Sequence, residues 1–135
     1  MRTILSSKLT KKEFIEKVEE ISGQNVFACY HCGKCSAGCP IVSEMDLLPN
    51  QVIRYVQLGL QDEVLNSKSI WMCASCYTCT VRCPKDVDLA KIMEALRVLK
   101  LRQNIDMSRV RDLPSEDLES LPPIALVSAF RKYTP

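Results

Sequence analysis

The chain has 135 residues, 47% hydrophobic and 25% charged, which suits about one domain and excludes a disordered or fibrous protein. Its 18 Lys and Arg and 16 Asp and Glu are evenly distributed, so no basic face predicts nucleic-acid binding. No apolar stretch is long enough to span a bilayer, and the first residues do not resemble a signal peptide. We expect a cytoplasmic, soluble protein without membrane insertion.

The first predicted element is a helix that begins after residue 10. Thr10 and Glu13 form a capping box, and Gly23 follows the expected end near Ile21. Apolar residues recur at helical spacing along one face of this segment. They are Phe14, Ile15, Val18 and Ile21.

The eight cysteines lie in two short runs with the pattern CxxCxxCxxxCP. The second run repeats the first 44 positions later, and only Cys and Pro are identical between them. The first run is Cys29, Cys32, Cys35, Cys39 and Pro40, and the second is Cys73, Cys76, Cys79, Cys83 and Pro84.

This spacing predicts two [4Fe–4S] clusters. The first three Cys of a run can ligate one cluster, and in two-cluster ferredoxins the fourth Cys ligates the other. We expect one cluster on Cys29, Cys32, Cys35 and Cys83, and a second on Cys73, Cys76, Cys79 and Cys39. Two closely spaced runs of four Cys fit zinc sites or disulfides much less well than they fit two clusters.

Helical signals continue between the two runs. Pro49 suits the first position of a helix, and Gly59 suits the position just past its end. A short helix over Asp62–Leu65 is expected to follow. The apolar positions of the longer helix are Val52, Ile53 and Val56.

A longer helix is predicted after the second run. Asp86 or Asp88 would cap it, and it would continue to about Gln103. Its expected buried face consists of Leu89, Ile92, Met93, Leu96 and Leu99. No segment alternates as a strand would, so the predicted fold is all-α, with helices packed around two clusters.

Residues 106–135 are expected to form an irregular tail after a cluster-binding domain of residues 1–105. Pro114, Pro122 and Pro123 should break any long helix. The apolar stretch 123–130 either covers the domain's own core or docks on a partner protein, and we favour docking.

Several single residues near the runs have two interpretations. His31, Lys34 and Arg82 are either solvated loop groups or neighbours that influence a cluster's potential. Trp71 either shields a cluster from water or is an ordinary core residue. The chain contains no catalytic triad, no phosphate-binding loop and no Cys outside the two runs, so nothing in it predicts substrate chemistry.

The frame around the two runs resembles the C subunit of heterodisulfide reductase, over about residues 20–103 and again at 124–131. The residues that carry this resemblance are Met45-Asp46, Pro49, Gln57-Leu58-Gly59, Ser69-Ile70-Trp71, Arg82-Cys83-Pro84, Val87-Asp88 and Leu96-Arg97.

The resemblance implies an α-helical ferredoxin and a role in anaerobic metabolism. In that family, this subunit relays electrons between a flavin-containing subunit and a catalytic subunit, which reduces a disulfide. The chain would then be a non-catalytic electron-transfer subunit of an oxidoreductase complex. The alternatives are the iron–sulfur subunit of a succinate, glycolate or glycerol-3-phosphate dehydrogenase, and a free ferredoxin.

Overall fold

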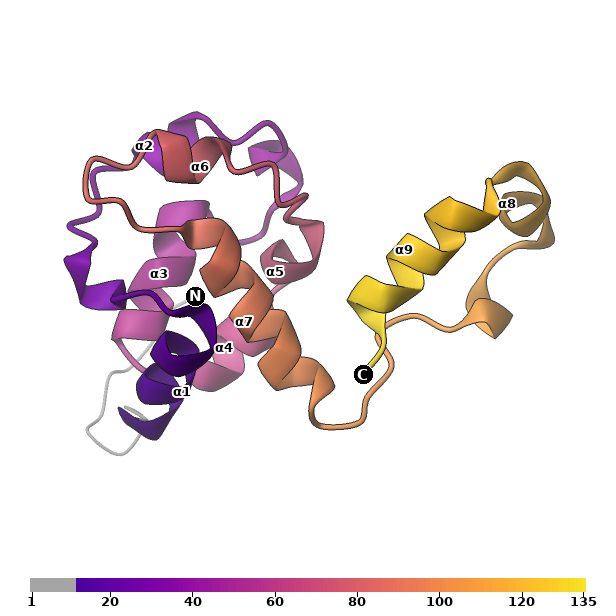
Figure 1. The fold of residues 1–135 in the computed structure, drawn as a ribbon, viewed down its shortest axis with the longest axis horizontal. Coiled ribbons are helices and arrows are strands. Elements are labelled where there is room, and N and C mark those ends of the chain that lie inside the picture. The colour runs from indigo at the N-terminus through magenta and orange to yellow at the C-terminus, as the bar shows by residue number, and fades with distance from the viewer. Residues whose placement is uncertain (1–11) are drawn as a thin grey trace. The chain divides into compact units, whose positions relative to one another are not determined.

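The computed structural model describes residues 12–135, and this part of the chain contains helices and no strands (Figure 1). The all-α class is therefore confirmed. The chain forms two compact units, which divide between Leu96 and Arg97. The Thr10 capping position lies outside the described residues. Within them, no helix has both the length and the apolar character needed to cross a membrane.

The first unit is organised around α3 (Pro49–Gln57). This helix contacts α1 (Lys12–Ser22), α4 (Gln61–Leu65), and the short helical turn η1 (Val26–Ala28). Its apolar face is buried because Val, Ile and Val recur at helical spacing, as predicted. These residues are Val52, Ile53 and Val56.

Local glycine and proline signals mark the helix boundaries as expected. Pro49 occupies the first position of α3, where its missing N–H leaves no hydrogen bond unmade. Gly23 follows α1 with φ 65°, and Gly59 follows α3 with φ 67°. Both glycines adopt the left-handed conformation that ends helices, which most other residues adopt at an energetic cost.

The helix α7 (Leu89–Leu101) begins after Asp88, the second of the two candidate caps. The Asp88 carboxylate accepts the backbone N–H of Lys91 at 3.2 Å, whereas Asp86 lies in the preceding turn with φ 53°. The predicted inner face is buried at Leu89, Ile92, Met93 and Leu96. Leu99 is only half-buried.

Two short helical segments complete the first unit outside the cysteine runs. The helical turn η2 (Val42–Glu44) follows the first run, and α5 (Ser69–Met72) leads directly into Cys73. Trp71, on α5, is 8% exposed and belongs to the core of this unit. This burial supports the interpretation of Trp71 as a core residue.

The second unit is helical rather than irregular, so the expectation of an irregular tail was wrong. After the turn η3 (Val110–Asp112) come α8 (Ser115–Ser120) and α9 (Pro123–Tyr133). The prolines do not break these helices, because Pro114 precedes α8 and Pro123 stands at the first position of α9. At a helix start, the fixed φ of proline favours the helix.

Candidate metal centre

The two cysteine runs form a structural repeat. A one-turn helix, α2 (Lys34–Ala37), lies in the first run, and α6 (Thr78–Val81) lies at the equivalent positions of the second. The two helices contact each other, and Figure 1 shows them side by side. The repeat that sequence comparison shows only for Cys and Pro therefore extends to the backbone.

Left-handed residues also recur at equivalent positions. His31 (φ 62°) corresponds to Ser75 (φ 52°), and Gly33 (φ 79°) corresponds to Tyr77 (φ 59°). A left-handed conformation costs an ordinary residue on the order of 1 kcal/mol. The same backbone shape is therefore kept in the second run although a tyrosine replaces the glycine, which indicates that this shape matters for both loops.

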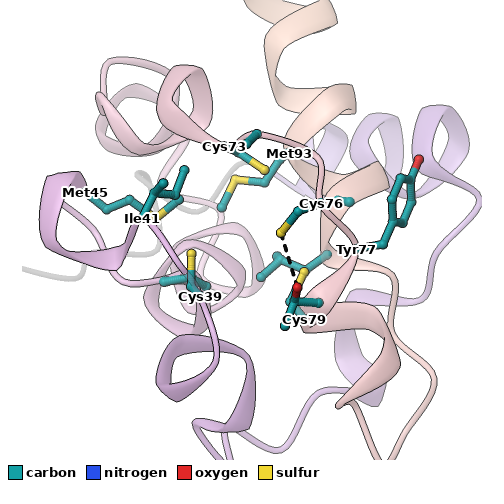
Figure 2. Close-up of a pocket in the computed structure, with 13 residues that line it drawn as sticks. Cys39, Ile41, Met45, Cys73, Cys76, Tyr77, Cys79 and Met93 are labelled. Carbon is teal, nitrogen blue, oxygen red and sulfur yellow. Dashed lines mark hydrogen bonds between the residues drawn. The ribbon is translucent and has the colours of Figure 1, made fainter.

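One cavity in the first unit is lined by four cysteines from the two runs. In Figure 2 the sulfur atoms of Cys39, Cys73, Cys76 and Cys79 surround this common space. The structure therefore places the fourth Cys of the first run beside the first three of the second.

The reciprocal arrangement occurs in a second cavity. Its lining includes Cys29, Cys32, Cys35 and Cys83. Cys79 and Leu89 line both cavities, so the two spaces share a wall. Each predicted set of four cysteines is thus brought together around its own cavity.

All eight cysteines are thiols rather than disulfides. Among residues 12–135, no three His, Cys, Asp or Glu side chains are close enough to bind one metal ion. The four ligands of a [4Fe–4S] cluster bond to different iron atoms, so they stand farther apart than the ligands of a single ion. An all-thiol set of four is the donor set that such a cluster requires.

The second Cys of each run is the exposed one, and both are stabilised as thiolates. The backbone N–H of Lys34, aided by the Tyr30 hydroxyl, lowers the pKa of Cys32. The Thr78 hydroxyl, 3.4 Å from the sulfur, and the Thr78 N–H lower the pKa of Cys76. Thiolates are the form that ligates iron.

The third Cys of each run lies deeper in the protein. Burial raises the pKa of both the Cys35 and the Cys79 thiol. Two thiolates close together in such an environment repel each other, and the positive charge of bound iron would compensate them. The pKa of Cys35 and the pKa of Cys79 shift in the same direction because the two residues occupy equivalent positions of the repeated backbone.

A hydroxyl after the third Cys ties each loop to a helix of the first unit. The Ser36 hydroxyl donates to Asn50 Oδ1 at 2.7 Å and accepts the Asn50 N–H at 3.1 Å, in the first turn of α3. The Thr80 hydroxyl donates to Asp88 Oδ1 at 2.9 Å, just before α7. These bonds fix one loop to the start of α3 and the other to the start of α7.

Gln57 fixes the start of the first run. Its side-chain amide donates to the carbonyls of Val26 at 2.8 Å and Cys29 at 3.2 Å, and its oxygen lies 2.7 Å from His31 Nε2. Because the amide oxygen is an acceptor, His31 Nε2 donates in this bond. The role of Gln57 could not be predicted from the sequence, since no local signal connects it to residues 26–31.

Asp46 fixes the start of the second run. Its carboxylate accepts the N–H groups of Leu47, Lys68 and Ser69 and the Ser69 hydroxyl, at distances of 2.6–2.9 Å. Burial alone would raise the pKa of Asp46, but the Ser69 hydroxyl and the three N–H groups together lower it. These bonds hold α5 immediately before Cys73.

We expect Asp46→Asn to destabilise the protein by about 1 kcal/mol, because it removes the charge from four hydrogen bonds of a side chain whose exposure to solvent weakens their contribution. A carboxyl with a lowered folded-state pKa stabilises in full above its unfolded pKa of about 3.9. The difference in melting temperature from the native chain should therefore stay constant between pH 8 and about pH 5. The contribution is lost only as the pH falls through the lowered pKa.

Glu44→Gln provides the control for this prediction. Glu44 is an exposed carboxylate two residues away, at the end of η2, and its replacement should leave the melting temperature almost unchanged. An Asp46→Asn variant as stable as Glu44→Gln would show that the carboxylate does not hold α5.

Comparison with known proteins agrees with this site. A family model described as a 4Fe-4S dicluster domain matches residues 25–87, which contain both cysteine runs. The fold and the site thus define an α-helical iron–sulfur protein that binds [4Fe–4S] clusters.

Relatives identify the family more narrowly. The C subunit of ferredoxin:CoB-CoM heterodisulfide reductase from Methanosarcina mazei is 31% identical over 113 residues, covering 82% of this chain and 70% of the relative. The iron-sulfur C subunit of CoB–CoM heterodisulfide reductase from Methanopyrus kandleri is 40% identical over 92 residues, covering 67% and 48%. The chain belongs to the family of heterodisulfide reductase C subunits.

The match to several relatives is partial in length. The C subunit of H(2):CoB-CoM heterodisulfide,ferredoxin reductase from Methanothermobacter thermautotrophicus is 35% identical over 86 residues, which are 64% of this chain and 46% of the relative. The chain thus spans about half the length of several curated relatives that it matches.

Proposed function

We propose that the chain is the electron-transfer subunit of a heterodisulfide reductase-like complex and holds two [4Fe–4S] clusters. The observation that carries this proposal is the lining of the two cavities. Cys39 joins Cys73, Cys76 and Cys79 at one, and Cys83 joins the first three Cys of the other run at the second. This arrangement supports the crossed ligand sets.

When bound, such clusters take up and release one electron at a time. The chain's own residues would hold the ligands in place and control access of water. Gln57 and Asp46 fix the entry of each run, while Ser36 and Thr80 tie the loops to α3 and α7. We assign no substrate chemistry to this chain, since every Cys is used as a ligand.

The proposal includes two partners, a flavin-containing subunit and a catalytic, disulfide-reducing subunit. Residues 106–135 would form a separate docking region beyond a cluster domain of residues 1–105. The exposure of apolar residues on α9 supports this, since Ile124 is 73% exposed and Val127 is 55% exposed. A cytoplasmic location fits eight thiols kept reduced for metal binding.

An anaerobic affinity purification of the tagged chain from its own cells, analysed by mass spectrometry, tests this function. We expect a flavoprotein and a second, Cys-rich iron–sulfur protein in stoichiometric amounts. A chain that keeps its iron but has no stable partner would instead be a free ferredoxin. Recovery of a succinate, glycolate or glycerol-3-phosphate dehydrogenase would place the chain in another complex.

A matched pair of α9 variants tests the docking region within the same experiment. Ile124→Asp combined with Val127→Asp should reduce partner recovery at least about tenfold, because it places charge in a buried apolar contact. Ala129→Asp, at an exposed position on the opposite side of the same helix, should leave recovery unchanged. Equal recovery for both would exclude α9 from the interface.

A further inference from the structure

The repeat allows the surroundings of the two cavities to be compared position by position. Burial of the ligands does not distinguish them. In each run the second Cys is exposed and the other three are half-buried. Solvent exposure is one of the main influences on the potential of an iron–sulfur site, and here it is matched between the two sites.

Hydrogen bonds to the exposed ligands are matched as well. Cys32 receives the backbone N–H of the residue two positions later and the hydroxyl of Tyr30. Cys76 likewise receives the N–H of Thr78 and bonds to its hydroxyl. Each exposed sulfur thus has a neighbouring backbone N–H and a hydroxyl as partners, so the exposed ligands are matched. One further bond is found at Cys83, whose sulfur accepts the backbone N–H of Val87 at 3.3 Å, and this bond favours reduction of the site to which Cys83 belongs.

The charge of the two cavity linings differs as well. Lys34 stands between the ligands Cys32 and Cys35 and lines their cavity, whereas Thr78 stands at the equivalent position of the other run. Of the described residues that line the other cavity, none is a lysine, arginine, aspartate or glutamate. Besides the cysteines, Thr78 and Tyr77, that lining consists of apolar residues.

The nearby cation Arg82 does not remove this difference. Its side chain lies across Gly38, where an added Cβ would come within 2.6 Å of the Arg82 Cδ atom. Arg82 lines neither of the two cavities. Lys34 is therefore the lysine or arginine that distinguishes one cavity lining from the other.

We propose that Lys34 makes the site of Cys29, Cys32, Cys35 and Cys83 the more easily reduced of the two. A cation beside this site favours the added negative charge, and the uncharged surroundings of the other site do not. When the protein holds a single added electron, that electron leaves the site of Cys39, Cys73, Cys76 and Cys79, which is oxidised. It enters the site of Cys29, Cys32, Cys35 and Cys83, beside Lys34, which is reduced. No atom is transferred. This inference rests on the two-cluster function proposed above.

The test is an anaerobic redox titration of the full, iron-loaded chain with dithionite, followed by EPR spectroscopy. The native chain should show two separate reduction steps. Lys34→Gln should lower the higher of the two potentials and leave the lower one in place. The equilibrium constant between the two sites should fall about tenfold, which is about 59 mV for one electron.

Two control variants separate charge from other effects. Lys34→Arg keeps the cation and should retain the native titration. Lys68→Gln removes a lysine from an exposed position before α5, outside both cavities, and should change neither potential by a comparable amount. An effect of Lys34→Gln that Lys68→Gln reproduces would overturn the assignment.

The outcomes also separate this inference from the function on which it rests. If Lys34→Gln shifts the lower potential, both potentials equally, or neither, Lys34 does not set the difference, although the two-cluster site stands. If the native chain binds iron for fewer than two clusters, the proposed function fails and this inference fails with it. Iron content and the EPR spectrum distinguish these cases before any potential is measured.

Discussion

Cys39→Ala should remove the cluster that Cys73, Cys76 and Cys79 help to hold and leave the other cluster intact. The reason is the position of Cys39, which lines the cavity of the second run although it belongs to the first. Iron content should fall by about half, from about eight atoms per chain to about four. Anaerobic iron analysis and EPR of the reduced protein measure this loss.

The lost cluster is identified by comparison with variants of undisputed ligands. The EPR spectrum of Cys39→Ala should match that of Cys76→Ala, and the spectrum of Cys83→Ala should match that of Cys32→Ala. The opposite pairing, with Cys39→Ala matching Cys32→Ala, would show that each run binds one cluster with its own four cysteines.

Removal of iron should strongly destabilise the two cysteine loops. Neither α2 nor α6 contributes a buried residue, so apolar burial does little to hold these turns in place. Metal ligation must supply most of their folding free energy, on the order of 5 kcal/mol or more by analogy with structural zinc. Anaerobic chelation should lower the melting temperature by more than about 10 °C.

Hydrogen exchange provides the internal control for this prediction. Backbone amides in residues 29–40 and 73–84 should lose protection after chelation. The amides of α3 should be affected less, because Val52 and Val56 are fully buried in an apolar core that needs no metal. Equal exchange with and without iron would mean that the loops are stable by themselves.

Local signals allowed much of this fold to be predicted. Gly23, Pro49 and Gly59 mark helix boundaries through their own backbone preferences, which need no tertiary context. The cysteine sets could be proposed for a similar reason, because ligand spacing along the chain limits how a cluster is held. Their ligation remains a prediction, although the structure groups the same residues around two cavities.

Other features depend on contacts that no local pattern reveals. Gln57 bonds to the carbonyls of Val26 and Cys29, 31 and 28 residues earlier, and Asp46 bonds to Lys68 and Ser69, 22 and 23 residues later. Both residues belong to the frame that carries the family resemblance, but the sequence does not indicate which groups they bond to. Their role follows only from the way the helices pack.

Proline caused the one clear error in the predicted fold. Pro114 and Pro123 were expected to break helices, and they instead stand just before α8 and at the start of α9. The same residue disfavours a helix interior and favours a helix start. The residues around Pro123 are apolar whether they form a helix or an irregular segment. The hydrophobic pattern alone therefore could not decide between these two structures.

Iron and acid-labile sulfide analysis of the anaerobically purified full chain tests the central proposal most directly. Two [4Fe–4S] clusters require about eight iron and about eight sulfide per chain. That result would support both cavities as cluster sites. About four of each, or zinc in place of iron, would contradict the account.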